Sequence, residues 1–157
     1  MKGSFTGNAM PDDSFYVQGL CFSCTRCSVC CRFEPGYVFL SKTDVDILAS
    51  FLSMDYTGFI VAYCRWINGY EGKARLSLNE KANYDCIFWK KGCTVYPGRP
   101  KQCRMFPFWP DILSSREAWD NAGRSCPGIG KGKRCDRSYI ESRLKERQAD
   151  PVIEKAI

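Results

Sequence analysis

Eleven cysteines and no histidine constrain this 157-residue chain more than any other feature of its sequence. Without histidine there is no Cys–His zinc finger, no His-ligated catalytic metal, and no Ser–His–Asp or Cys–His catalytic arrangement. The chemistry of the chain must therefore use sulfur, carboxylates or a bound cofactor. An odd number of cysteines also fits a fully paired disulfide scaffold poorly. We interpret the cysteines first as metal ligands and keep a disulfide scaffold as the alternative.

The rest of the sequence predicts a cytoplasmic protein with no membrane association. Residues 1–14 are polar and lack the apolar core of a signal peptide. The best local apolar run, residues 59–63, is far shorter than the roughly 18 residues that a membrane span needs. Thiols stay reduced in the cytoplasm, which favours metal binding over disulfides.

Two central helices are expected from capping and periodicity. Ser41 and Asp44 have the spacing of a capping box that opens a helix, and the apolar side chains that follow share one face. A second helix is predicted over residues 57–67, where apolar residues recur at i, i+4 and i+8 and place Cys64 on the apolar face. A third, C-terminal helix over residues 136–149 should stop before Pro151 and dock weakly, because its apolar stripe consists only of Ile140 and Leu144.

Short strands are expected at residues 15–17, 75–78, 85–89 and 93–96, and four prolines exclude a helix of any length over residues 97–110. The sequence thus predicts a small, loop-rich α+β single domain organised around Cys-ligated metal. It has two central helices, short strands and a C-terminal helix. We divide it into a flexible lead-in (1–20), a cysteine-cluster metal-binding domain (21–135) and a charged helical tail (136–157).

Five of the cysteines fall within residues 21–31, in the pattern Cys21-x2-Cys24-x2-Cys27-x2-Cys30-Cys31. One C-x2-C unit places two thiolates on one turn facing one metal, and its repetition here makes the metal signal strong. Thiolates packed this densely repel one another unless a cation neutralises them. Remote partners follow at Cys86, Cys93, Cys103 and Cys126.

This pattern resembles the YkgJ-type cysteine-cluster family, whose CxxCxxCC domains are described as chelating zinc or iron. The resemblance runs over about residues 20–130 and is carried by Cys24, Cys27, Cys30, Cys31-Arg32, Cys86, Cys93, Val95-Tyr96, Arg99-Pro100, Cys103-Arg104, Phe106-Pro107-Phe108 and Cys126-Pro127-Gly128. It implies that the eight cysteines in that series ligate metal, but it settles neither the metal nor a reaction. One departure is Ser28, where many members have glycine.

The cysteine pattern is also similar to that of FliB-type flagellin lysine methylases, in which an iron–sulfur cluster is implied. From this second resemblance we carry over the metal chemistry only, because the chain shows no separate methyltransferase-like region.

The eight motif cysteines divide into two sets of four. Neighbouring side chains point in different directions, so Cys30 and Cys31 should serve different metals. As a hypothesis, Cys24, Cys27 and Cys30 form one site closed by Cys126, since such a run closed by a remote Cys-Pro resembles a [4Fe–4S] pattern. Cys31 crosses to a second site with several of Cys86, Cys93 and Cys103.

The other three cysteines are weaker candidates. Cys21 keeps the x2 register and is a possible substitute ligand. Cys64 is expected to be a buried structural thiol. Cys135 follows several basic residues, which favours either a lowered pKa or an ordinary exposed thiol.

The triple x2 spacing favours an iron–sulfur cluster over zinc. Iron bound by cysteine without sulfide is a further form of the same prediction. The predicted function is metal binding, with electron transfer or support of a partner enzyme as its use. The alternative is a zinc-binding structural or interaction module. No pair of carboxylates has a diagnostic spacing, so enzymatic activity is left unassigned.

The formal charge of +6 raises nucleic-acid binding through Lys131, Lys133 and Arg134. Acidic residues interrupt the basic ones in the tail, so a solvated face is favoured over nucleic-acid contact. In addition, eight thiolates bound to two dications leave a negative balance that part of this basicity would offset. The partners expected from sequence are metal ions and a protein, with no membrane.

Overall fold

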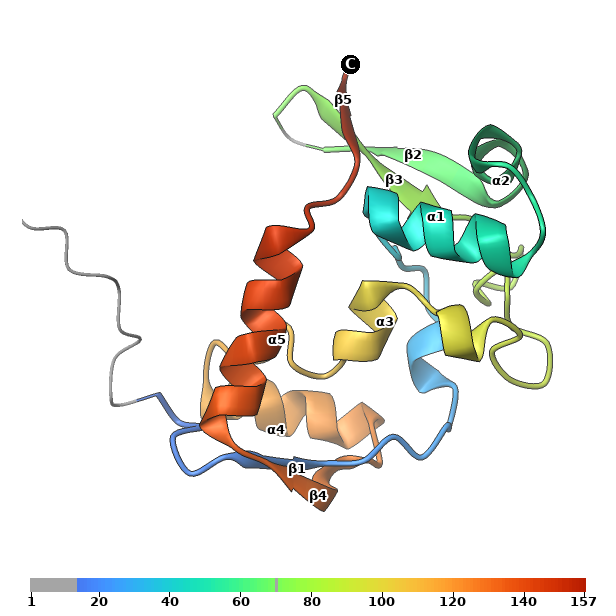
Figure 1. Cartoon of the computed structure of the whole chain (residues 1–157). Helices are drawn as coiled ribbons and strands as arrows, with labels where there is room; N and C mark the ends of the chain where they lie inside the picture. The colour runs from blue at the N-terminus through green and yellow to red at the C-terminus, as the bar shows by residue number, and fades with distance from the viewer. Residues whose placement is uncertain (1–13, 70) are drawn as a thin grey trace, which may run out of the picture.

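The computed structural model describes residues 14–69 and 71–157, which form an α+β domain with two hydrophobic cores (Figure 1). One half contains a three-stranded sheet and two helices, and the other contains a two-stranded sheet and two further helices. The elements are β1 (Leu20–Phe22), η1 (Val29–Cys31), α1 (Lys42–Phe51), α2 (Tyr56–Tyr63), β2 (Cys64–Asn68), β3 (Lys73–Leu78), η2 (Tyr96–Gly98), α3 (Lys101–Met105), α4 (Arg116–Ser125), β4 (Ile129–Cys135), α5 (Arg137–Ala149) and β5 (Glu154–Ala156). The small α+β fold expected from sequence is confirmed.

The upper core lies under the sheet of order β2-β3-β5, in which both pairings are antiparallel. The predicted capping box is confirmed at α1, where Ser41 and Asp44 exchange hydrogen bonds between side chain and backbone. This cap fixes the start of α1 and turns its apolar face toward the sheet. The buried residues of the upper core are Leu40, Val45, Leu48, Ala49, Phe59, Leu76, Leu78, Phe88 and Val95.

The helix predicted over residues 57–67 is wrong in its second half. Helix α2 ends at Tyr63, and Cys64–Asn68 is strand β2, paired with β3 from Cys64↔Leu78 to Asn68↔Ala74. Pairing with β3 satisfies a full ladder of backbone groups and outweighs the helical periodicity. Cys64 therefore lies at the start of a strand and not on a helix face.

Helices α1 and α2 are short. In the described part of the chain no single helix has the length and apolar character to cross a membrane. Only α1 and α2 taken together would meet that requirement, and they are bent by 92° at the break between them.

The lower core lies between the β1–β4 ribbon, α4 and α5. The predicted C-terminal helix is confirmed as α5, which Asp136 caps by accepting a hydrogen bond from the Tyr139 amide. The weak docking predicted for this helix is wrong. The Ile140 side chain inserts into the lower core and has 0% exposure. The buried residues of the lower core are Tyr16, Leu20, Phe108, Leu113, Trp119, Ile129 and Ile140.

Several predicted strands are absent. Residues 15–17 form a turn closed by the Val17 amide on the Ser14 carbonyl, and residues 1–13 of the predicted lead-in lie outside the described residues. Residues 85–89 and 93–96 contribute only isolated bridges, such as Trp89↔Cys93, because tight turns occupy these segments. Residues 97–110 do hold one helix, the five-residue α3, which fits between Pro100 and Pro107.

A buried polar network joins α1, α3 and the end of α5. Asp44, 1% exposed, accepts a hydrogen bond of 2.8 Å from the Lys101 amide at the start of α3. The Lys101 Nζ donates to Asp150 at 2.6 Å, and the Ser41 hydroxyl donates to the same carboxylate at 2.8 Å. Burial raises the pKa of Asp150, but the hydrogen bonds from Lys101 and Ser41 outweigh it and hold the pKa below its usual range. The network fixes α3 relative to both halves.

We expect the Lys101–Asp150 pair to contribute to stability as a coupled unit. In a double-mutant cycle with Lys101→Met and Asp150→Asn, urea unfolding at pH 7 should give a coupling energy of about 1–3 kcal/mol, since both groups are largely buried. The exposed pair Lys42–Asp46, cycled in the same way, should give a much smaller coupling energy, because solvent screens both charges. Equal coupling in the two cycles would contradict the role assigned to this network.

Candidate metal centre

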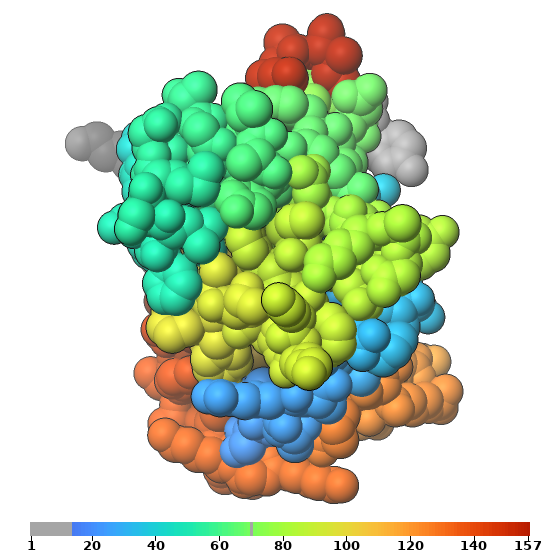
Figure 2. All heavy atoms as spheres, turned by 90° about the vertical axis from the view of Figure 1, so that its right-hand side faces the viewer, coloured from blue at the N-terminus to red at the C-terminus, as the bar shows by residue number. Residues whose placement is uncertain are grey.

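The motif cysteines lie at the junction of the two cores. Cys86 and Cys93 pack against the upper core, and Cys126 packs against the lower one. Cys103 lies on α3, between the halves. The segment that carries the first cysteines (blue) passes between the yellow segments above it and the orange segments below it (Figure 2). Cysteines from distant parts of the sequence are thus brought to one region.

The loop of residues 23–31 is attached to both halves. At its start the Ser23 amide donates to the Gly128 carbonyl at 3.3 Å, and at its end the Cys86 amide donates to the Cys31 carbonyl at 2.7 Å. Between these points the backbone is left-handed at Arg26 (φ 56°) and at Ser28 (φ 68°). Left-handed residues turn the chain sharply, so the loop changes direction at two points between its cysteines.

At four motif cysteines the backbone amide two residues later interacts with the sulfur atom. The Arg26 amide lies 3.4 Å from the Cys24 Sγ. At three other cysteines the amide two residues later lowers the pKa of the thiol. Burial raises the pKa of each of these thiols by more, so the net shift is upward. Amide donors stabilise a thiolate and keep its lone pairs directed at one point. The pairs are Cys24 with Arg26, Cys86 with Phe88, Cys93 with Val95, and Cys126 with Gly128.

The Sγ atoms of Cys30 and Cys31 lie 3.8 Å apart. The expectation that these neighbours point in different directions is therefore wrong, because the tight turn of η1 brings the two side chains together. Their shared hydrogen bond lowers the pKa of Cys30 to about 7, and the same bond, with burial, raises the pKa of Cys31. One proton between two sulfurs is the arrangement that a bound cation would replace.

Electrostatic interactions connect the motif cysteines, and Cys30 interacts with Cys86, Cys93 and Cys103 as well as with Cys126. The pKa of Cys126 is raised by burial first and then by Cys27 and Cys30. The pKa of Cys31, by contrast, is raised in part by Cys103 and Cys86. Within residues 14–69 and 71–157, no group of three or more Cys, Asp or Glu side chains already has the geometry to hold a metal ion. The thiol donor set fits soft metals, and ligation requires the sulfurs to close in further.

Arginine side chains balance the sulfur-rich region. The Arg99 guanidinium stacks on the Tyr96 ring at 3.8 Å, and its charge contributes to lowering the pKa of Cys30. In the sequence Arg99 stands out only as part of the Arg99-Pro100 motif. Its position four residues before Cys103 is the signal that could have identified it as a cation near the sulfurs. Arg32 instead pairs with Asp85 at 3.0 Å and stacks over Trp89.

The three non-motif cysteines have different surroundings. Burial raises the pKa of Cys64 to about 12, as suits a structural thiol. Burial also raises the pKa of Cys135, despite the nearby Lys133, and its thiol points at the Lys133 carbonyl. Cys21 lies on β1 and interacts electrostatically with Cys135.

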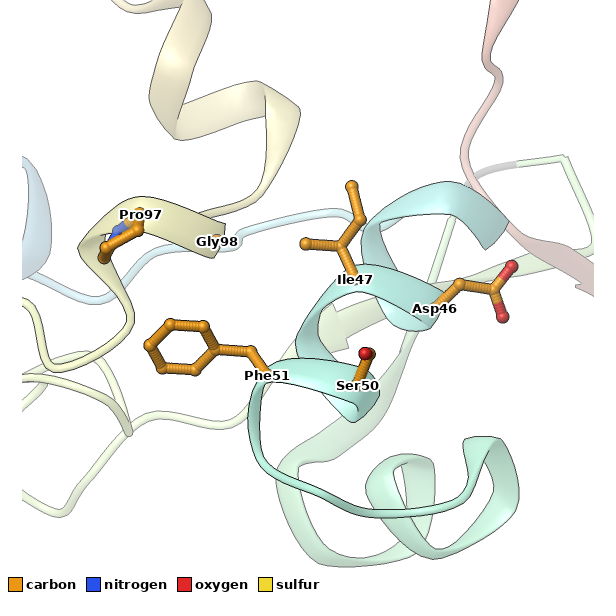
Figure 3. A pocket seen from close by; sticks show the side chains of 6 residues that line it. All are labelled: Asp46, Ile47, Ser50, Phe51, Pro97 and Gly98. Carbon is orange, nitrogen blue, oxygen red and sulfur yellow. The ribbon is translucent and has the colours of Figure 1, made fainter.

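A hollow of about 470 Å³ lies away from these sulfurs, between α1 and η2 (Figure 3). Ile47 and Phe51 of α1 face Pro97 and Gly98 of η2 across it. No cysteine lines this hollow, so it does not belong to the candidate metal centre.

Comparison with known proteins finds a family model that spans the motif cysteines from Cys24 to Cys126. Residues 23–127 match the CxxCxxCC family model, described as a "Putative zinc- or iron-chelating domain". An uncharacterized protein of Methanocaldococcus jannaschii is 26% identical over 118 residues, which cover 73% of this chain and 60% of that protein. The chain therefore spans less than two thirds of the length of this relative. No solved structure matches the chain significantly.

We expect Ser28→Gly to favour the metal-binding conformation of the loop. Glycine adopts the left-handed region without the cost of a Cβ, so loop closure should become easier and metal affinity should rise by about two- to fivefold. Chelator competition measures this change. Ser53→Gly is the matched control, because Ser53 is also left-handed (φ 54°) but lies beyond α1. A gain in both variants, or in neither, would show that the Ser28 conformation is unrelated to metal binding.

Proposed function

This chain belongs to the CxxCxxCC family of metal-chelating domains, and on that premise we propose that its eight motif cysteines bind metal at the junction of the two cores. The ligands are Cys24, Cys27, Cys30, Cys31, Cys86, Cys93, Cys103 and Cys126. The observation that carries the proposal is the set of interactions between backbone amides and cysteine sulfurs, of which the hydrogen bond from the Arg26 amide to the Cys24 Sγ is one. They occur at four motif cysteines and supply the donors that a metal-bound thiolate uses.

The cysteines divide into two adjacent sets. One set consists of Cys24, Cys27, Cys30 and Cys126. The electrostatic interaction of Cys126 with Cys27 and Cys30 supports this grouping. The other set consists of Cys31, Cys86, Cys93 and Cys103. The electrostatic interaction of Cys31 with Cys86 and Cys103 supports this grouping. The Cys30–Cys31 doublet lies where the two sets meet.

We assign the first set to an iron–sulfur cluster, most simply [4Fe–4S]. A C-x2-C-x2-C run closed by a remote Cys-Pro is the spacing that such clusters use. Aromatic rings near the loop favour this assignment, because a dry surround tunes the potential of a cluster. Phe22 packs edge-to-face on Phe106 at 6.2 Å, and Phe106 packs on Trp109 at 5.2 Å.

Zinc is the second candidate, and one distance favours it. Two thiolates on one tetrahedral ion, with metal–sulfur bonds of about 2.3 Å, lie about 3.8 Å apart. The Cys30 and Cys31 sulfurs have this separation. In a [4Fe–4S] cluster each cysteine binds a different iron, so the sulfurs lie farther apart. Shared ligation of one ion by the doublet would make the domain a zinc-stabilised structural module.

The use of the metal follows from exposure. Cys24, Cys27 and Cys30 are exposed, so a cluster in the first set would lie at the surface. A surface cluster can exchange electrons with a partner protein, and we propose electron transfer or support of a partner enzyme as its role. Reduced thiols are required throughout, which is consistent with a cytoplasmic location.

Elemental composition tests the choice of metal. After anaerobic purification, we expect iron and acid-labile sulfide in near-equal amounts, with a broad visible absorbance that dithionite bleaches. Stoichiometric zinc without sulfide would overturn the cluster and leave the zinc module. A metal-free, fully folded protein would contradict both forms of the proposal.

Ligand variants test the residues. Cys126→Ser should lose at least half of the metal and lower Tm by about 10 °C. Loss of a structural ligand costs several kcal/mol of stability, and each kcal/mol lost lowers Tm by about 2–4 °C in a domain of this size. Cys27→Ser should behave in the same way. Cys135→Ser and Cys64→Ser are the matched controls, because both residues are partly buried cysteines outside the motif. Equal metal loss from ligand and control variants would show that the assignment is wrong.

A further inference from the structure

A second hollow, of about 330 Å³, lies beside the loop of the first cysteines. Its walls come from β1, α3, β4 and the first turn of α5, and Cys24 lies at its edge. This volume is at the lower end of the range for small-molecule sites. The hollow is separate from the one between α1 and η2, which has no residue in common with it.

Positive charge predominates around this hollow. Arg104, Lys133 and Arg134 line it together with one acid, Asp136. The Asp136 carboxylate accepts the Tyr139 amide at 2.8 Å, and Arg134 donates to the Gln18 carbonyl, so both are engaged. In the described residues, the side chains of Arg104 and Lys133 have no hydrogen-bond or ion-pair partner. The first turn of α5 adds the positive end of a 13-residue helix.

One wall of the hollow is aromatic. The Phe22 ring meets the Phe106 and Phe108 rings edge-to-face, with centroids 6.2 and 6.1 Å apart. Tyr139 packs edge-to-face on Phe108 at 6.1 Å. Such a wall offers a flat apolar surface opposite the cationic side chains.

We propose that this hollow binds a small organic anion that combines a planar apolar group with a carboxylate or phosphate. Arg104 and Lys133 would hold the anionic group through charge-assisted hydrogen bonds, and the aromatic wall would contact the planar part. Cys24 at the edge places the bound molecule next to the first set of motif cysteines. This site goes beyond metal chelation and does not depend on which metal is bound.

The arrangement favours a small molecule over a nucleic acid. A nucleic acid would use an open basic stripe, and Lys131 on the same strand would then contribute as much as Lys133. Both lysines are exposed, but Lys133 lines the hollow and Lys131 does not.

Isothermal titration of the metal-loaded protein with benzoate, phenyl phosphate and inorganic phosphate tests the proposal, with neutral benzamide as the control probe. We expect benzoate or phenyl phosphate to bind, and benzamide and inorganic phosphate to bind at least about tenfold more weakly. Lack of binding by either aromatic anion up to about 10 mM, or equal binding of benzoate and benzamide, would overturn the site.

Charge variants then locate the binding. Arg104→Gln and Lys133→Gln should each weaken binding of the aromatic anion by about tenfold, and Lys131→Gln should change it by less than about twofold. Metal content is measured for every variant, so failure of this site is distinguishable from loss of the metal. If Arg104→Gln also loses metal, Lys133→Gln decides, because it adjoins no motif cysteine in the sequence. Equal weakening by Lys131→Gln and Lys133→Gln would indicate an open basic surface and contradict the proposal.

Discussion

Repulsion between closely spaced thiolates is the constraint on which the rest of this structure depends. Each half of the domain has its own apolar core, but the junction between them holds sulfur atoms from the early loop, the turns of residues 86–93, α3 and the end of α4. Apolar burial cannot join surfaces of this kind. In the function that we propose, a cation that binds the thiolates would convert their repulsion into attraction and would couple metal binding to association of the two halves.

The polar surroundings of the junction prepare the sulfurs for that event. Backbone amides already point at four of them, and Arg99 places a positive charge close to Cys30. The Asp44–Lys101–Asp150 network holds α3, and therefore Cys103, relative to α1 and α5. Positions that look like ordinary helix caps in the sequence thus orient a candidate ligand.

Local signals in the sequence predicted the start of α1 at Ser41, the span of α5 and the strand at residues 75–78, because short-range capping and patterning decide them. Long-range pairing decided what was missed. Strand β2 forms in place of the end of a helix because β3 pairs with it, and β1 forms because β4 returns beside it. The cysteine motif predicted the family, whereas the adjacency of Cys30 and Cys31 depends on the η1 turn and could not be derived from spacing.

The central claim is that metal lies between the two cores with cysteine sulfur as its ligand. Anomalous scattering from crystals of the anaerobically purified protein, measured at the iron and zinc absorption edges, tests it most directly. The account predicts metal peaks at the junction, bonded to cysteines of the early loop, to Cys126 and to cysteines of residues 86–103. Peaks held by surface carboxylates, or bonded to Cys21, Cys64 and Cys135 in place of the motif cysteines, would contradict it.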